Sequence, residues 1–255
     1  MSDIRAEYID HMGNDLGIVN DARVSFGKRS EYEYDRINDT WYLKEADKRL
    51  IKFLARGVES KDWEGAVNEL ICAVDKDEIE DVLKWAKRLP EHWTPFAQTS
   101  IKLREFYPIP IARQRFKHKI GMVENEISRR YVDNGLEFYQ PTWRKRAENK
   151  KQGSGEEFDP AAQAMLDDEY WWLMNKAEEM YGRFIQNGVC PEQARFLLPQ
   201  SMMTEVVITG NLYSFAQAYI KRRDSHAQKE IQLLAAEWDR IIRPLFPVAW
   251  SALVD

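Results

Sequence analysis

Cysteine is scarce in this chain. Cys72 and Cys190 are the only two among 255 residues, and they form no CxxC pair. The sequence therefore has no disulfide framework and no cysteine-rich metal site, which favours a reducing compartment. Histidine is scarce as well, with four residues, and no set of His, Cys, Asp and Glu has the spacing of metal ligands. We expect no metal site.

Long apolar runs and glycine-rich phosphate loops are also missing. No stretch approaches the roughly 20 apolar residues that span a bilayer, and the polar, acidic start of the chain has no signal-peptide core. We therefore expect a cytoplasmic protein without membrane contact. The 12 glycines form no GxGxxG or P-loop pattern, which argues against a Rossmann-type nucleotide site.

The composition is typical of a folded domain. Hydrophobic residues make up 44% of the chain, aromatic residues 12% and charged residues of both signs 31%, enough for a sizeable core and unlike a disordered chain. The formal net charge is −5. This balance argues against general binding to nucleic acid or membranes through bulk charge, so any anion site must be local.

Helices dominate the predicted secondary structure. Apolar periodicity and capping residues predict helices over 40–56, 61–72, a short segment from Asp75, Pro110 to His118, Pro160 to about Asn187, 191–198 and 214–243. Residues 99–106 alternate as a strand does, residues 22–26 look extended, and residues 145–158 indicate a surface loop. We expect an α+β fold that is largely helical.

Two basic stretches depart from the acidic average. Residues 113–131, RQRFKHKIGMVENEISRRY, carry a local charge of +4, and residues 221–230 read KRRDSHAQKE. On a helix Arg222 and His226 would share a face. Converging cations, amides and hydroxyls are what a phosphate group requires. The alternatives are a solvated helix face and, because Phe116 lies among the cations, a nucleic-acid-binding segment.

Several ordered blocks resemble the flavin-dependent thymidylate synthases. RQ, KHK and NEISRRY in the first basic stretch are similar to that family's R-H-R and N-E-x-S-x-R-Y signature. Lys117 and Lys119 replace its two arginines, the spacer is one residue longer, and Gln217 stands where the family often has Asn. The remaining blocks follow in order: ARVSF at 22–26, HWTPF at 92–96, ARFLLP at 194–199, Asn211 and RRDSHAQ at 222–228.

The resemblance implies a single domain over residues 1–255, with insertions at 57–91 and 134–165. It implies a largely helical α+β fold with a small antiparallel sheet, and a homotetramer with active sites shared at subunit interfaces. The implied reaction is methylation of dUMP to dTMP, with FAD as cofactor and NADPH and methylenetetrahydrofolate as co-substrates. A dUMP hydroxymethylase using the same site and a non-catalytic nucleic-acid-binding protein remain as alternatives.

The resemblance also implies roles for individual residues. Catalytic roles fall to Arg222, His92 and Glu126. The residues implied to bind dUMP are Gln114, Lys117, Glu126, Ser128, Arg130, Arg195 and Arg222. Those implied to contact FAD are Ser25, Thr94, His118, Lys119, Asn211, Gln217 and His226. Because the substrates and the cofactor are all anionic, a local basic patch on an acidic protein would concentrate them without general attraction to polyanions.

Overall fold

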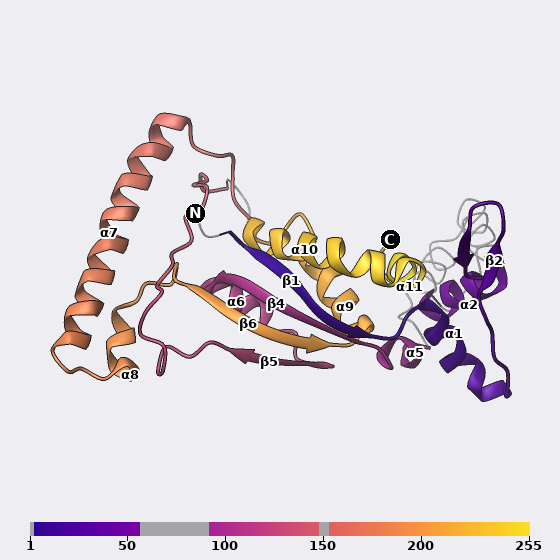
Figure 1. Cartoon of the computed structure of the whole chain (residues 1–255). Coiled ribbons are helices and arrows are strands. Elements are labelled where there is room, and N and C mark those ends of the chain that lie inside the picture. Colours follow the sequence, from indigo (N-terminus) through magenta and orange to yellow (C-terminus); the bar gives the residue numbers. More distant parts are fainter. Residues whose placement is uncertain (1–2, 57–91, 148–152) are drawn as a thin grey trace, which may run out of the picture. The chain divides into compact units, whose positions relative to one another are not determined.

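The computed structural model describes residues 3–56, 92–147 and 153–255, which form two compact units (Figure 1). The sheet unit comprises Met1–Ile9, Lys102–Thr209 and Ala218–Asp239. The helical unit comprises Asp10–Ile101, Gly210–Gln217 and Arg240–Asp255. The helices predicted at 61–72 and from Asp75, and the whole expected insertion at 57–91, lie outside the described residues.

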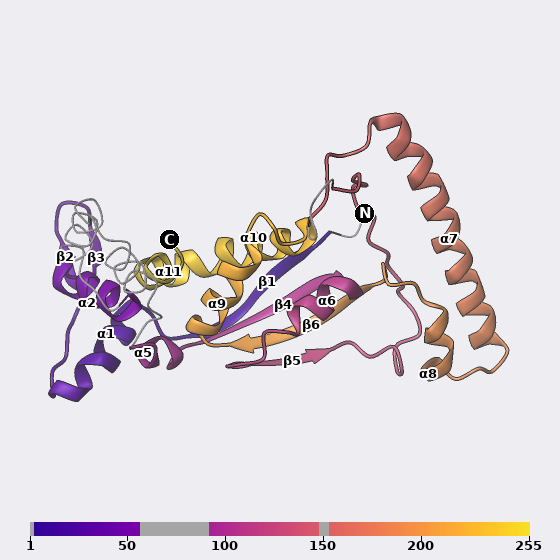
Figure 2. The same cartoon turned by 180° about the vertical axis from the view of Figure 1, so that it is seen from behind.

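The sheet unit is built on four strands in the order β1-β4-β6-β5 (Figure 2). The end of β4 meets the start of β6, where the backbone N–H of Ile109 donates to the carbonyl of Met202 over 3.2 Å, so these two strands run antiparallel. The predicted small antiparallel sheet and the predicted strand at 99–106 are confirmed. The strands are β1 (Arg5–Met12), β4 (Ser100–Pro108), β5 (Met122–Glu126) and β6 (Met203–Gly210).

Every second side chain along β4 and β6 is buried, and these side chains form the core of this unit. Leu103 and Tyr107 of β4 and Val206 and Ile208 of β6 are buried, as expected when every second residue points to one face. Glu105 of β4 is buried in the same row, although its side chain is a carboxylate and not an apolar group.

Helix α7 (Pro160–Gln186) forms as predicted. The carboxylate of Asp159 accepts hydrogen bonds from the N–H groups of Ala161 and Ala162, and the helix ends before Gly188, whose φ is 84°. Both views place α7 beside α8 (Pro191–Ala194), which continues as a 3-10 turn over Arg195–Leu197 (Figures 1 and 2). The short helix predicted at 191–198 is thus confirmed.

The prediction of one helix over 214–243 is wrong. Helix α9 spans Leu212–Arg222 and α10 spans Lys229–Leu245, with a turn between them. The turn forms because the Asp224 carboxylate accepts the N–H of His226 over 2.7 Å, while the Asp224 carbonyl accepts the N–H of Ala227. Arg222 and His226 therefore do not share a helix face.

The helix predicted from Pro110 to His118 is shorter than expected. Helix α6 spans Ile109–Arg115. Lys117 and His118 lie in the turn beyond it, and the N–H of His118 donates to the carbonyl of Arg115 over 3.1 Å. Gln114, Lys117 and His118 therefore do not share the face of one helix.

The helical unit packs α1 (Asp15–Arg23) against α2 (Glu45–Arg56) and α11 (Pro247–Val254). The buried carboxylate of Asp15 accepts the N–H groups of Val248 and Ala249 at 2.8 and 3.0 Å and so connects α1 to α11.

Residues 22–26, predicted to be extended, are helical: they complete α1 and a 3-10 turn that ends at Gly27, whose φ is 61°. The remaining elements are α5 (Thr94–Ala97) and the antiparallel hairpin β2 (Glu33–Asp35) with β3 (Thr40–Tyr42).

The helix predicted over 40–56 begins later, at Glu45, because Thr40–Tyr42 belong to that hairpin. Among the residues described, no helix combines the length and the apolar character needed to cross a membrane.

Candidate functional site

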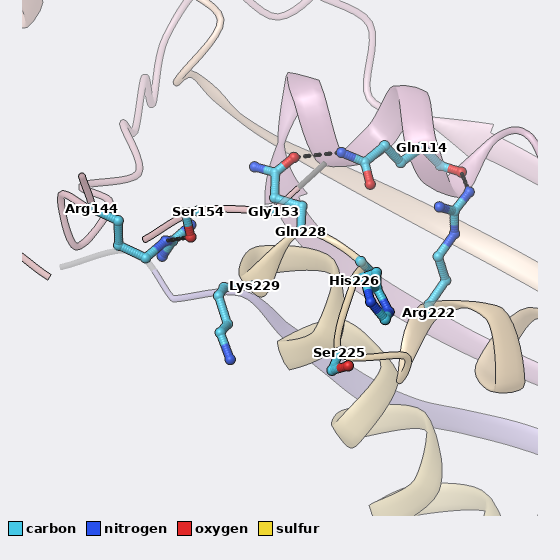
Figure 3. Close-up of a pocket in the computed structure, with 10 residues that line it drawn as sticks. Gln114, Arg144, Gly153, Ser154, Arg222, Ser225, His226, Gln228 and Lys229 are labelled. Carbon is cyan, nitrogen blue, oxygen red and sulfur yellow. Dashed lines mark hydrogen bonds between the residues drawn. The ribbon is translucent and has the colours of Figure 1, made fainter. Parts of the chain in front are cut away.

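One hollow of the sheet unit surrounds the turn between α9 and α10. It has a volume of about 550 Å³, within the range of small-molecule sites. We call it the Arg222 hollow (Figure 3). Its lining residues are Gln114, Arg144, Gly153, Ser154, Arg222, Ser225, His226, Ala227, Gln228 and Lys229.

Arg222 is held in a fixed orientation in this hollow. Its Nε donates to Nε2 of His118 and its Nη2 donates to the carbonyl of Gln114, both over 2.9 Å. Figure 3 shows the guanidinium directed at that carbonyl, and the side chain of Gln114 directed at Gln228, to which it donates over 2.6 Å. Burial lowers the pKa of His118 to about 4, and the charges of Arg222, Arg115 and Lys221 act in the same direction. His118 is therefore a neutral acceptor at pH 7.

The segment after β5 supplies a wall of the Arg222 hollow. Arg144 donates from Nη2 to Glu230 over 2.7 Å and from Nε to the hydroxyl of Ser154, also over 2.7 Å. Both members of the Arg144–Glu230 pair are mostly buried. The pair connects Arg144, and through it Ser154, to the start of α10, so part of the expected insertion at 134–165 lines this hollow.

A second hollow of the sheet unit, of about 530 Å³, lies beside β5 and the turn after α8. We call it the Arg195 hollow. Glu126 accepts the hydroxyl of Thr204 over 2.7 Å, and Ser128 accepts the N–H of Arg130 over 3.3 Å. The remaining lining residues are Ile109, Arg113, Ile127, Arg129, Arg195, Phe196, Leu198, Pro199, Gln200 and Met202.

The helical unit has a hollow of its own, of about 900 Å³, which we call the His92 hollow. His92 stacks on Phe53 with 5.6 Å between ring centroids and 29° between planes. Ser25 and Thr94 provide hydroxyl groups, and the cations are Arg23, Lys28 and Arg49. Aromatic and apolar walls with hydroxyl donors and positive charge suit a planar aromatic group that carries phosphates.

Comparison with known proteins decides the family. Residues 7–248 match the family model described as thymidylate synthase complementing protein. The chain belongs to the flavin-dependent thymidylate synthase family. It is 31% identical over 250 residues to the flavin-dependent thymidylate synthase of Wolbachia pipientis wMel, covering 97% of this chain and 72% of that relative. A Thermus thermophilus enzyme of the same name is 31% identical over 252 residues, covering 97% of this chain and 74% of that relative.

A solved structure supports the fold of this flavin-dependent thymidylate synthase family member. The crystal structure of a UMP/dUMP methylase PolB from Streptomyces cacaoi bound with 5-Br dUMP superposes with a TM-score of 0.73, at 24% sequence identity. The match covers 98% of this chain and 94% of that chain. The expected α+β architecture is therefore that of a known enzyme fold.

The structure divides the residues implied to bind dUMP between the two hollows of the sheet unit. Gln114 and Arg222 line one, while Glu126, Ser128 and Arg195 line the other, and the two share no described lining residue. Lys117 and Arg130 line neither of these two hollows, and Arg130 forms an ion pair with Glu192 at 2.9 Å.

The residues implied to contact FAD also do not lie in one place: some line different hollows and others line none of the three. Ser25 and Thr94 line the His92 hollow, His226 lines the Arg222 hollow, and His118 accepts from Arg222. Lys119 is ion-paired with Glu124, and Asn211 accepts the N–H of Ser214 at the start of α9. Gln217 lies on α9 and is partly exposed.

Sequence reasoning did not assign several residues that line the three hollows. Arg113 belongs to the basic stretch but had no role, and Arg144 lies near a loop whose fold the local sequence did not predict. Arg49 and Phe53 lie on the predicted helix at 40–56, where their spacing indicated only a helix face. The residues missed in this way are Arg23, Lys28, Arg49, Phe53, Arg113, Arg144, Ser154, Gln200 and Thr204.

Proposed function

We propose that this member of the flavin-dependent thymidylate synthase family converts dUMP to dTMP. FAD is its cofactor, methylenetetrahydrofolate its carbon donor and NADPH its reductant. Membership of the family supports the reaction. At the level of the site, the proposal rests on two polar hollows of the sheet unit that each contain arginine. One is lined by Gln114 and Arg222, and the other by Glu126, Ser128 and Arg195.

The proposed roles follow the chemistry of these side chains. Arg222, with its guanidinium fixed by His118 and Gln114, stabilises negative charge that develops on the uracil ring. Arg195 holds the phosphate group. We propose that Gln114, Lys117, Glu126, Ser128, Arg130, Arg195 and Arg222 bind dUMP, and that Ser25, Thr94, His118, Lys119, Asn211, Gln217 and His226 contact FAD.

The described residues fit a flavin dinucleotide. The His92 hollow offers a stacked aromatic pair, two hydroxyl groups and positive charge, which match a planar ring and a pyrophosphate. When bound, FAD would accept a hydride from NADPH and then pass a hydride on to complete the methyl group. His92 assists proton transfer or flavin positioning in this proposal.

The protein contributes orientation and charge rather than a nucleophile. The hydroxyl of Thr204 fixes the carboxylate of Glu126 by a hydrogen bond of 2.7 Å, so Glu126 presents a defined acceptor between nucleotide and flavin. Ser128 is a binding residue. Side chains that are held in place in this way lower the activation barrier of the reaction, because they orient the reactants and stabilise developing charge.

We further propose a homotetramer whose subunits share active sites. Two features support it: the dUMP-binding set is divided between separate hollows of one sheet unit, and α7 exposes an apolar stripe. That stripe consists of Met165, Trp172, Leu173 and Met180. A single domain over residues 1–255, with insertions at 57–91 and 134–165, and a cytoplasmic location complete the proposal.

The deciding assay measures NADPH oxidation that depends on both dUMP and methylenetetrahydrofolate, followed by mass analysis of the nucleotide product. We expect the mass of dTMP. A product with the mass of hydroxymethyl-dUMP would assign the hydroxymethylase reaction instead. A colourless protein that takes up no added FAD but retards DNA in a gel would assign the nucleic-acid binder.

A variant tests the site directly. Arg222→Gln removes the charge-assisted contact, which should weaken dUMP binding by about 1.5–3 kcal/mol. Arg104→Gln is the matched control, because Arg104 lies outside all three hollows and pairs with Glu205 at 2.9 Å on the exposed face of the sheet. Equal dUMP affinity in the two variants would remove Arg222 from the site.

A further inference from the structure

Helix α6 presents two neighbouring residues to two different hollows. Successive residues of an α-helix project about 100° apart. Gln114 lines the Arg222 hollow, whereas Arg113 lines the Arg195 hollow. The same short helix therefore contributes a polar side chain to each half of the proposed dUMP site.

The Arg195 hollow has an excess of positive charge. Three arginines line it, Arg113, Arg129 and Arg195, and Glu126 is the one carboxylate among its described lining residues. Arg129 is buried and donates to the carbonyls of Asn134 and Gly135 at 2.6 and 3.1 Å, so it stabilises the loop. Two guanidinium groups remain for a ligand.

Those two guanidinium groups are largely unused within the described part of the chain. Arg195 donates from Nε to the carbonyl of Glu192 over 3.2 Å, which leaves both Nη atoms for other acceptors. Arg113 is exposed, and its side chain makes no hydrogen bond or ion pair with any residue that the structure describes. Ser128 and Gln200, on the same hollow, add a hydroxyl and an amide.

Arg130 is arranged differently from Arg113. Its Nε and Nη2 atoms both contact Glu192, at 3.0 and 2.9 Å, and it does not line the hollow. Because a carboxylate already compensates its charge, Arg130 has less attraction left for a second anion. The charge available inside the hollow comes from Arg113 and Arg195.

We propose that Arg113 is a further phosphate-binding residue of the dUMP site and acts together with Arg195. The planar guanidinium fork matches the oxygen geometry of a phosphate group, and Ser128 and Gln200 donate neutral hydrogen bonds beside it. This inference rests on the proposed function, because it names a contact to the same nucleotide. It makes Arg113 a substrate-binding residue that leaves the chemistry at the uracil ring unaffected.

The test compares Arg113→Gln, Arg113→Lys and Arg195→Gln with the control Arg104→Gln. Dissociation constants for dUMP come from titration calorimetry, and inhibition by deoxyuridine, which lacks the phosphate, is measured in the same preparations. We expect Arg113→Gln to raise the dUMP dissociation constant at least about 10-fold, with the inhibition constant of deoxyuridine and kcat at saturating dUMP unchanged. Arg113→Lys, which keeps the charge without the fork, should fall between Arg113→Gln and the wild type.

The outcomes separate this inference from the proposed function. If Arg113→Gln binds dUMP as tightly as Arg104→Gln while Arg195→Gln binds it weakly, the role of Arg113 is overturned and the proposed function stands. If the wild type itself binds no dUMP, the proposed function fails. Equal losses of affinity for dUMP and deoxyuridine in Arg113→Gln would also overturn the role, because they would show a distorted hollow rather than a lost phosphate contact.

Discussion

Arg222 and His118 share a hydrogen bond in which the cation donates from Nε to Nε2 of the imidazole over 2.9 Å. Since an imidazole accepts only through an unprotonated nitrogen, His118 carries its proton on Nδ1 and is neutral. The bond thereby couples the orientation of a proposed catalytic arginine to the protonation state of a histidine.

This coupling predicts a pH dependence of stability. The pKa of His118 falls from 6.5 to about 4 on folding, chiefly through burial and then through Arg222, Arg115 and Lys221. Below pH 6.5 the unfolded chain binds a proton that the native state does not bind, so this residue lowers the free energy of unfolding as the pH falls from 6.5 to about 4. Denaturant unfolding over this range and up to about pH 8 measures it.

The variant His118→Gln serves as the comparison, because glutamine retains an acceptor but does not titrate. The wild type should lose more stability than His118→Gln over that interval. Parallel curves for the two proteins, or an NMR titration that places the pKa of His118 near its ordinary value, would contradict the assignment.

A buried ion pair between α6 and β4 predicts a large loss of stability when it is broken. Arg115 contacts Glu105 at 3.0 Å, both side chains are almost fully buried, and Trp238 donates to the same carboxylate over 2.7 Å. Arg115→Met leaves the charge of Glu105 without its cation, which should lower the free energy of unfolding by about 3–5 kcal/mol. Thermal or denaturant unfolding gives the value.

The double variant Glu105→Gln/Arg115→Met tests whether the loss comes from the isolated charge. It should be clearly more stable than Arg115→Met alone, since no unpaired charge remains buried. Additive losses from the two single substitutions would indicate that packing, and not charge, dominates at this position.

Two glycines, one inside α7 and one just after its end, form a matched pair. Gly188 follows the helix with φ at 84°, whereas Gly182 lies inside it, and a Cβ at either position would meet no atom within 4 Å. Gly188→Ala should therefore destabilise the protein by about 1 kcal/mol through backbone strain alone. Gly182→Ala should stabilise it by about 0.5–1 kcal/mol through helix propensity. Changes of the same sign in both melting curves would contradict this explanation.

Local signals in the sequence were sufficient for α7. Asp159, Pro160 and Gly188 mark its ends through interactions within a few residues of each helix end, so the boundaries could be read directly. Strands β1, β5 and β6 were missed because their pairing partners are distant in the sequence. The helix predicted over 214–243 failed because apolar periodicity continues on both sides of the turn that Asp224 forms.

The residues of the candidate site also fall into two groups, those that the sequence could indicate and those that only the fold brings in. Residues in the recognised blocks, such as Arg222 and Ser128, were predicted from resemblance to the family. Residues such as Arg144 and Thr204 enter the hollows through contacts with Glu230 and Glu126, which lie about 80 residues away along the chain. No local pattern reports contacts of that range, so they required the folded structure.

Ser128 should behave as a binding residue. Its hydroxyl accepts the N–H of Arg130 over 3.3 Å, and no histidine lines the Arg195 hollow among the described residues. Ser128→Ala should therefore retain turnover while the dUMP dissociation constant rises roughly 2- to 10-fold, the effect of one neutral hydrogen bond. Steady-state kinetics and dUMP titration check both parts. Loss of all turnover with dUMP binding intact would contradict this role and indicate that Ser128 is a nucleophile.

The exposed stripe on α7 should hold subunits together. Met174 and Tyr181 form the buried face of the helix, while Trp172 projects from the opposite side and Leu173 from beside it, exposed by 65% and 52%. An apolar stripe opposite a packed face favours contact with a second copy of the helix. Trp172→Glu together with Leu173→Glu should lower the molar mass in light scattering and, because the proposed sites are shared, the activity.

The control for this prediction introduces the same charge elsewhere on the helix. Asn175 is exposed and lies about 110° around the helix from the centre of the stripe. Asn175→Glu should leave the molar mass and the activity as in the wild type. If the double variant keeps the wild-type mass, α7 is not the contact; if the mass falls while activity per chain is retained, the sites are not shared between subunits.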